Sequence, residues 1–226
     1  MTRICGVDGC KYGWIALISL ENFSNVEWRL ARNWTDLRLD AAVVAVDMPI
    51  GLAASGRRGC DEAARKVPNM RPASIFPMPV RGAFDFQNYA EANAWSKANG
   101  HGGVVKQAWN LKSKLLQLEA EVLGAPNAPL YEAHPELAFA RLSGGGLPPK
   151  KSIAGRERRR ALLDSAGIAG LDRILQDVPR AQAAADDVLD AAVLLVTARR
   201  ILNGAAVCYP ETPLTNAQGM TMRIWV

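Results

Sequence analysis

The stretch AAVVAVD, residues 41–47, constrains the fold most, because it is apolar at every position until it ends in Asp47. A strand that is covered on both faces has this pattern, whereas a half-exposed strand alternates apolar and polar residues. We therefore expect a central strand in a sheet that carries helices on both faces. Three stretches at about 3–8, 13–20 and 26–31 precede it and predict an antiparallel meander.

Helical spacing dominates the second half of the chain. The predicted helices lie at about 88–98, 104–123, 135–142, 155–165, 171–176 and 182–202, and the later strands at 130–134, 205–209 and 222–226. A meander, then a central strand, then helices is the order of elements in a ribonuclease H-like fold. We predict a single α/β domain over residues 1–226, in which the mixed sheet combines the antiparallel meander with parallel strands.

Charge and cysteine usage narrow the class of protein. The chain has 27 Lys and Arg against 22 Asp and Glu, a net charge of +5, which favours an anionic partner such as nucleic acid. Its 4 cysteines include no Cys-x-x-Cys pair, so we expect no zinc site. No apolar stretch approaches the roughly 18 residues that span a bilayer, and no signal-peptide pattern opens the chain. We expect a cytoplasmic protein without membrane contact, and homodimerisation stays open.

Three predicted strands end with an acidic residue or place one near their exit: Asp8, Asp47 and Glu132. In open sheets with parallel strands, ligands bind outside the carboxyl ends of those strands, so these side chains can converge. Each has another interpretation. Asp8 could cap the turn between Gly9 and Gly13, Asp47 could bond the backbone of its own Pro-Ile-Gly turn, and Glu132 could face solvent.

The last long helix carries more acidic residues. Asp187 and Asp190 are three positions apart, so they share one helix face, and that face continues into apolar residues. A carboxylate in such surroundings is paired, protonated or bound to a cation, because an isolated buried charge is too costly. Asp186, by contrast, is expected only to complement the helix dipole, an interpretation that Asp187 also allows. Oxygen ligands without histidine or thiolate favour Mg²⁺ or Mn²⁺.

Basic residues cluster where a substrate phosphate could be held. Lys150, Lys151, Arg156 and Arg159 lie at and after a Gly- and Pro-rich break, and Arg156 and Arg159 share a helix face. Arg71 and Arg81 lie in the long irregular segment 52–86, which could form a basic lip over the acidic residues. The commoner meaning of such a run is a solvated face.

Several motifs together resemble one family along nearly the whole chain. These are GVDGCKYGW (6–14), VDMPIGL (46–52), RGCDEAAR (58–65), SIFPMPVR (74–81), YEAHPELAF (131–139), KKSIAGRERR (150–159), DDVLDAAVLLVTA (186–198) and GMTMRIWV (219–226). On these motifs the chain resembles the domain of unknown function 429 family, which is described as predicted nucleases of the ribonuclease H fold. Tyr12 departs from the family pattern, which usually has a second glycine there.

The resemblance implies a ribonuclease H-like fold and a nuclease activity. Carried over by motif, Asp8 is the acid of the first strand, Glu132 the acid at a strand exit, and Asp187 with Asp190 the pair on the last helix. This arrangement is similar to that of Holliday-junction resolvases. Asp47 belongs to a signature of the family itself.

The leading hypothesis is a metal-dependent nuclease that hydrolyses phosphodiester bonds by a two-metal carboxylate mechanism. Asp8 would bridge two Mg²⁺ or Mn²⁺ ions about 3.5–4 Å apart. Glu132 or Asp187 would help one ion to activate a water, and Asp190 would help the other to stabilise the leaving oxygen. The alternative is a non-catalytic module that binds nucleic acid or protein. A phosphotransferase of the actin and sugar-kinase type is set aside, because it needs two such domains.

Overall fold

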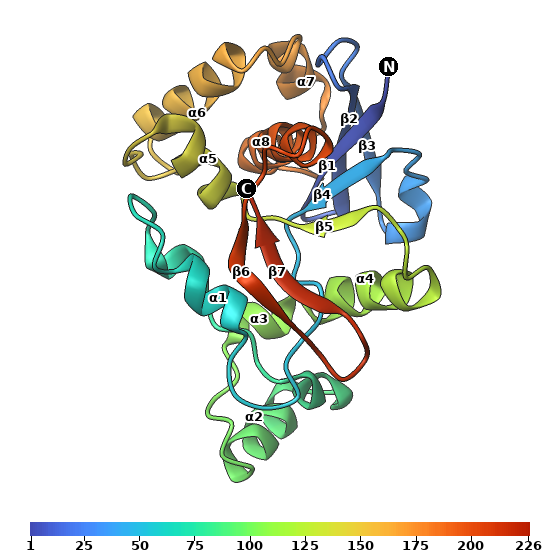
Figure 1. Cartoon of the computed structure of the whole chain (residues 1–226), viewed down its shortest axis with the longest axis vertical. Coiled ribbons are helices and arrows are strands. Elements are labelled where there is room, and N and C mark those ends of the chain that lie inside the picture. Colours follow the sequence, from blue (N-terminus) through green and yellow to red (C-terminus); the bar gives the residue numbers. More distant parts are fainter.

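The computed structural model describes residues 1–226 and contains a five-stranded mixed sheet in the order β3-β2-β1-β4-β5 (Figure 1). Its strands are β1 (Arg3–Gly9), β2 (Trp14–Leu20), β3 (Glu27–Ala31), β4 (Val43–Val46) and β5 (Leu130–Glu132). The first three are antiparallel, whereas β4 runs parallel to β1 and β5 parallel to β4. The predicted α/β class with a mixed sheet is confirmed, and the arrangement is consistent with a ribonuclease H-like fold.

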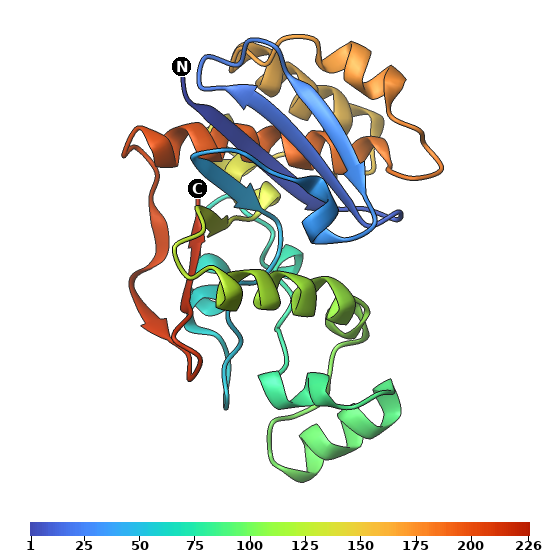
Figure 2. The same cartoon turned by 90° about the vertical axis from the view of Figure 1, so that its right-hand side faces the viewer.

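Helices cover both faces of this sheet, as the apolar run of β4 predicts (Figure 2). The first face packs against α5 (Pro135–Ser143), α6 (Ile153–Ser165), α7 (Leu171–Asp177) and α8 (Ala185–Leu202). The second packs against η1 (Trp34–Leu37) and α4 (Lys112–Gly124). Along β1, Ile4 joins the core on the α8 side, while Cys5 and Val7 join the core on the α4 side. This alternation fixes which residues of a strand can meet α8.

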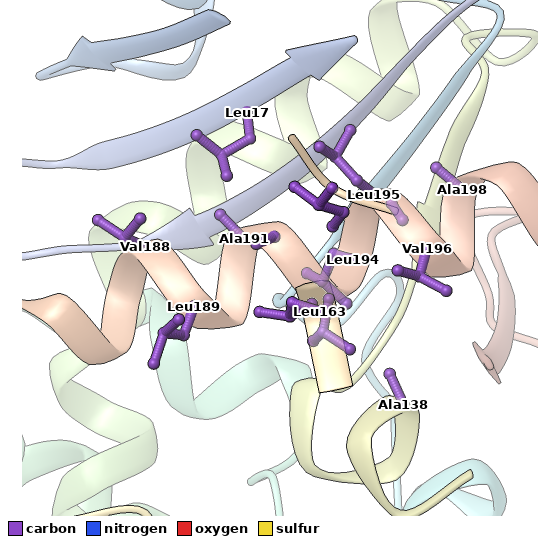
Figure 3. Close-up of a cluster of buried hydrophobic side chains, with 14 of the residues drawn as sticks. Leu17, Ala138, Leu163, Val188, Leu189, Ala191, Leu194, Leu195, Val196 and Ala198 are labelled. Carbon is purple, nitrogen blue, oxygen red and sulfur yellow. The ribbon is translucent and has the colours of Figure 1, made fainter. Parts of the chain in front are cut away.

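Helix α8 packs closely against the backbone of the sheet. Leu17 of β2, Leu163 of α6 and Ala138 of α5 surround the apolar side chains of α8 (Figure 3). Gly6 of β1 lies directly beneath the helix, and a Cβ added there would lie 2.2 Å from the carbonyl oxygen of Ala191. The absence of a side chain at residue 6 therefore lets α8 cross β1 closely.

The remaining elements form a layer beside the carboxyl ends of β1 and β4 (Figure 1). They are α1 (Gly59–Ala64), η2 (Pro72–Ser74), η3 (Arg81–Asp85), α2 (Tyr89–Ala98), α3 (Lys106–Asn110), β6 (Cys208–Thr215) and β7 (Thr221–Trp225). A third core joins α1, the β6–β7 hairpin and α5 through Cys60, Ile75, Leu137 and Ile224. The chain between β4 and α2 thereby covers one end of the sheet.

The structure corrects a few predicted boundaries. The helix expected at 104–123 is two helices, α3 and α4, because the N–H of Leu111 bonds the carbonyl of Ala108, three residues back. The strand expected at 205–209 is β6, which begins at Cys208 and continues to Thr215. No helix of the chain combines the length and the apolar character that crossing a membrane requires.

Candidate functional site

Asp8 lies at the end of β1 and is 7% exposed. The alternation along β1 places residues 4, 6 and 8 on the face that packs against α8. Its Oδ1 accepts a hydrogen bond of 2.7 Å from the N–H of Gly9. Asp8 thus caps the turn, as one interpretation expected, but only one of its two oxygens takes part. Burial raises the pKa of Asp8 well above its ordinary value, and the neighbouring Asp47 and Asp190 raise it further.

Asp47 follows β4 and lies beside Asp8. Val46 is the register partner of Val7, and the N–H of Asp47 donates to the carbonyl of Val7 at 2.9 Å, which continues the pairing of the two strands. The two aspartates thus follow paired residues of adjacent parallel strands, so their side chains lie on the same face of the sheet. Burial raises the pKa of Asp47 to about 7.

Asp190 reaches the same place from α8 and is 4% exposed. Its Oδ2 accepts a hydrogen bond of 3.1 Å from Nζ of Lys150, which lies in the segment between α5 and α6. Burial raises the pKa of Asp190 to about 7, against the lowering effect of Lys150. Asp8, Asp47 and Asp190, called the three-aspartate cluster below, therefore share one nearby cation, the half-exposed Lys150.

These shifts predict how the stability of the metal-free protein depends on pH. Asp47 and Asp190 have a pKa of about 7 in the folded chain and 3.8 ordinarily, so between these values the folded state binds more protons. The free energy of unfolding should therefore rise as the pH falls through 7. We expect the Tm in EDTA to be several degrees higher at pH 6 than at pH 8, since each kcal/mol is worth about 2–4 °C at this size.

The control for this experiment is the double variant Asp47→Asn/Asp190→Asn, whose Tm should change less over the same interval and keep only the slope due to Asp8 and Glu132, whose pKa values burial also raises. Carboxylates with ordinary pKa values stay ionised between pH 8 and 6 and do not contribute. A Tm that is equal at the two pH values in the wild type, or a slope as steep in the double variant as in the wild type, would contradict the assignment.

Glu132 belongs to a different group of charges. It is the register partner of Val46, whose side chain joins the core on the α4 side, so Glu132 emerges on the opposite face from Asp8 and Asp47. Its Oε1 accepts from Nη1 of Arg58 at 3.0 Å, and its Oε2 accepts from the N–H of Ile50 at 2.7 Å. The same Nη1 bonds Asp61 at 2.7 Å. Burial raises the pKa of Glu132 to about 7, although Arg58 opposes the shift.

We call Arg58, Asp61 and Glu132 the Arg58 triad. Together with Cys60, its two acids place three ligand atoms within 4.8 Å of one another, which is close enough for a metal ion. The guanidinium of Arg58, only 1% exposed, already supplies the positive charge to both carboxylates. The oxygens of the three-aspartate cluster are less closely spaced, but only the half-exposed Lys150 balances their charge, so this cluster is the better candidate for a metal site.

Asp187, the other predicted ligand, bonds its own helix. Its Oδ2 accepts the N–H of Ala184 at 2.8 Å, at the start of α8, as the alternative interpretation anticipates. It is still close enough to Asp8 to raise the pKa of that residue. The structure thus brings Asp8, Asp47 and Asp190 together, with Asp187 beside them and Glu132 on the other face.

Only some of the basic residues predicted to contact phosphate lie beside the acidic residues. Arg159, which was predicted to contact phosphate, is instead buried, and its Nη2 lies 2.8 Å from Glu136. Arg81 is held by Asp85 and Glu119. Lys151 and Arg156 are exposed on the α6 side. Two positively charged side chains do lie beside the acidic residues, since Lys150 and the exposed Arg71 both line the central cavity.

This cavity has a volume of about 360 Å³ and lies between the carboxyl ends of the parallel strands and the segment that follows β4. All three members of the three-aspartate cluster line it, as do the Arg58 triad and the first turn of α5. His134 caps α5 through its side chain, and burial lowers its pKa. The sequence does not reveal that Arg58 is buried and paired with two acids, because its arginine-rich segment predicts a basic lip over the acidic residues.

Comparison with known proteins places the chain in a family without assigning it an activity. Neither a search of curated proteins nor a search of solved structures found a match. A family model described as "Protein of unknown function (DUF429)" matches residues 6–215. The match includes Asp8, Asp47, Glu132, Asp187 and Asp190 within one continuous span. The chain therefore belongs to the DUF429 family, as its motifs predict.

Proposed function

We propose that this protein is a metal-dependent nuclease that hydrolyses phosphodiester bonds. One observation carries the proposal. Three aspartates come together from β1, the end of β4 and α8, and Lys150 is the one cation that lowers the pKa values of all three. Such a concentration of like charge raises carboxyl pKa values until a proton or a cation is bound, which makes it a candidate functional site.

The donor set fits a hard divalent ion. The three-aspartate cluster offers carboxylate oxygens and neither imidazole nor thiolate, which favours Mg²⁺ or Mn²⁺ over zinc. A bound ion would lower the pKa of a water and stabilise charge on phosphoryl oxygens. Asp8, Asp47 and Asp190 would hold it, with Asp187 adding negative charge beside them.

Other residues would position the substrate and the surrounding chain. Lys150 and Arg71 line the cavity with positive charge and are suited to hold phosphate oxygens. Glu132 would act through its surroundings, because its bonds to Arg58 and to the N–H of Ile50 fix the chain just beyond Asp47. In this proposal Glu132 is a positioning residue, although the motif places it among the ligands.

A non-catalytic nucleic-acid-binding module remains the second candidate. The observation in its favour is the ion pair between Lys150 and Asp190, which supplies a cation to the cluster without any metal. A module of this kind would bind polynucleotides in a salt-dependent manner, and EDTA would not affect it.

The test compares the wild type with Asp8→Asn. We expect Mn²⁺ to bind the wild type in a calorimetric titration and to raise its Tm, and Asp8→Asn to weaken binding at least about 100-fold. That figure follows because even partners of metal ligands cost 10- to 100-fold. Mg²⁺-dependent cleavage of single-stranded, duplex or branched nucleic acid should be lost in parallel.

Asp164→Asn is the matched control, since Asp164 is an exposed aspartate of α6 outside the cavity. It should bind Mn²⁺ and cleave as the wild type does. The proposal fails if wild type and Asp8→Asn bind Mn²⁺ equally, or if no substrate of the panel is cleaved by the Mg²⁺-loaded wild type.

A further inference from the structure

The cavity beside the three-aspartate cluster also has apolar lining residues. They are Met48, Ile75, Phe76, Met78, Leu111 and Ile224. Four of these side chains are almost fully buried, whereas Phe76 and Leu111 are half-buried. A site that held only a metal ion and a phosphate would not need such a surface.

Phe76 is placed on a fixed segment. On one side of it, the carbonyl of Ile75 accepts a hydrogen bond of 3.0 Å from Arg65, and the Ile75 side chain enters the third core. On the other side, Met78 enters the core on the α4 side. Pro77 and Pro79 restrict the backbone between and beyond these anchors. The phenyl ring is therefore carried by a segment that is anchored on both sides.

Leu111 approaches the cavity from a different part of the chain. It is the residue at which the predicted single helix divides into α3 and α4, and it caps the end of α3. Phe76 and Leu111 thus come from two separate supports and line the same cavity as Asp8 and Lys150. Both side chains therefore offer apolar surface to a group bound in this cavity.

Size limits what can enter. A volume of about 360 Å³ lies near the lower end of the 300–1,000 Å³ that is usual for small-molecule sites. One nucleotide falls in this class, whereas double-stranded DNA, whose major groove alone is about 12 Å wide, does not. The exposed Arg71, which also lines the cavity, is suited to the phosphate of an adjoining nucleotide outside it.

We infer that the cavity binds a single unpaired nucleotide, with its phosphate at Lys150 and the three-aspartate cluster and its base against Phe76 and Leu111. The inference rests on the proposed function and adds the substrate class, namely single-stranded ends or unpaired nucleotides in place of intact duplex. Bases of any sequence would be accepted, because every base has a face that can stack on an aromatic ring.

The test measures binding, independently of turnover. Calorimetric titrations in Mn²⁺ compare adenosine 5′-monophosphate with ribose 5-phosphate, which carries the same phosphate and sugar without the base. We expect the nucleotide to bind the wild type more tightly. Phe76→Ala should weaken nucleotide binding by about 5- to 150-fold, the equivalent of one base–aromatic stack, and leave ribose 5-phosphate unchanged.

Phe76→Leu is the second variant, because it keeps most of the apolar volume and removes the aromatic face. It should bind the nucleotide more weakly than the wild type and more tightly than Phe76→Ala, and its Tm shows that the fold is retained. In cleavage assays, single-stranded oligonucleotides should be cut faster than the same sequences in blunt duplexes.

The outcomes separate this inference from the proposed function. If the wild type binds Mn²⁺ but binds nucleotide and ribose 5-phosphate equally, or binds neither, the base site is overturned and the metal site stands. If Mn²⁺ does not bind, the proposed function fails, and the same pair of ligands titrated in EDTA still decides for or against the base site. Duplex cut as fast as single strands would also overturn the inference.

Discussion

Replacing Arg58 with methionine is expected to lower the free energy of unfolding by about 3–5 kcal/mol, the range found when one partner of a buried ion pair is removed. Arg58 is 1% exposed and donates to both Asp61 and Glu132. It also donates to the carbonyls of Gly51 and Ile50, so its loss leaves four acceptors without their donor. Urea denaturation of the metal-free protein measures the change.

Two controls isolate the effect of the buried charge. Arg57→Met removes the same side chain at the neighbouring, exposed position, and it should change stability by less than about 0.5 kcal/mol. Adding Glu132→Gln to Arg58→Met should recover part of the loss, because one uncompensated carboxylate is removed. If Arg57→Met and Arg58→Met destabilise equally, the triad does not stabilise the fold as described.

The pH dependence of this variant follows from the pKa of Glu132, about 7 in the intact triad. Without Arg58, which lowers that pKa, the carboxyl group should hold its proton to still higher pH. A raised folded pKa means that stability is lost as the pH rises. The deficit of Arg58→Met should therefore be largest at pH 8 and smaller at pH 6.

Gly6→Ala is the second substitution with a large expected effect. The new Cβ would lie 2.2 Å from the carbonyl oxygen of Ala191 and 2.6 Å from the backbone nitrogen of Leu195, so rotamer changes cannot relieve the clash. Either α8 or β1 has to move. Overpacking of this kind typically costs about 1–3 kcal/mol, and contact with backbone places this site at the upper end.

The same substitution should also affect the proposed metal site. Asp190 precedes Ala191 directly, so displacement of α8 carries Asp190 away from Asp8, which is anchored on β1. We expect Gly6→Ala to weaken Mn²⁺ binding together with stability, as calorimetry and thermal melting can show. Gly124→Ala is the control, since a Cβ there meets nothing within 4 Å. Wild-type stability and Mn²⁺ affinity in Gly6→Ala would contradict the close crossing.

The edge of the sheet at which the acids gather could be predicted from the sequence, but the face on which each one lies could not. Asp47 follows a strand that is apolar at every position, so no alternation indicates which way its side chain points. Glu132 ends a strand of three residues, which is too short to reveal a face. Only the register of β4 and β5 shows that Val46 and Glu132 share a side.

Long-range pairing explains the other differences. Arg58 and Glu132 are separated by 74 positions, and nothing local distinguishes Arg58 from the exposed Arg57 beside it. Likewise, neighbouring positions of one arginine run behave oppositely, since Arg159 is buried against Glu136 while Arg160 is exposed. Charge patterns along the chain predict that such arginines lie at the surface. Tertiary packing decides which of them are buried instead.

The ion pair between Lys150 and Asp190 also bears on how the chain reaches its folded state. Three carboxylates this close would oppose collapse if each needed a divalent ion to arrive first. The ammonium group of Lys150 beside Asp190 offsets part of this repulsion without any metal. We therefore expect the protein to stay folded when it is purified in chelator, in contrast to small zinc domains, which unfold when their metal is removed.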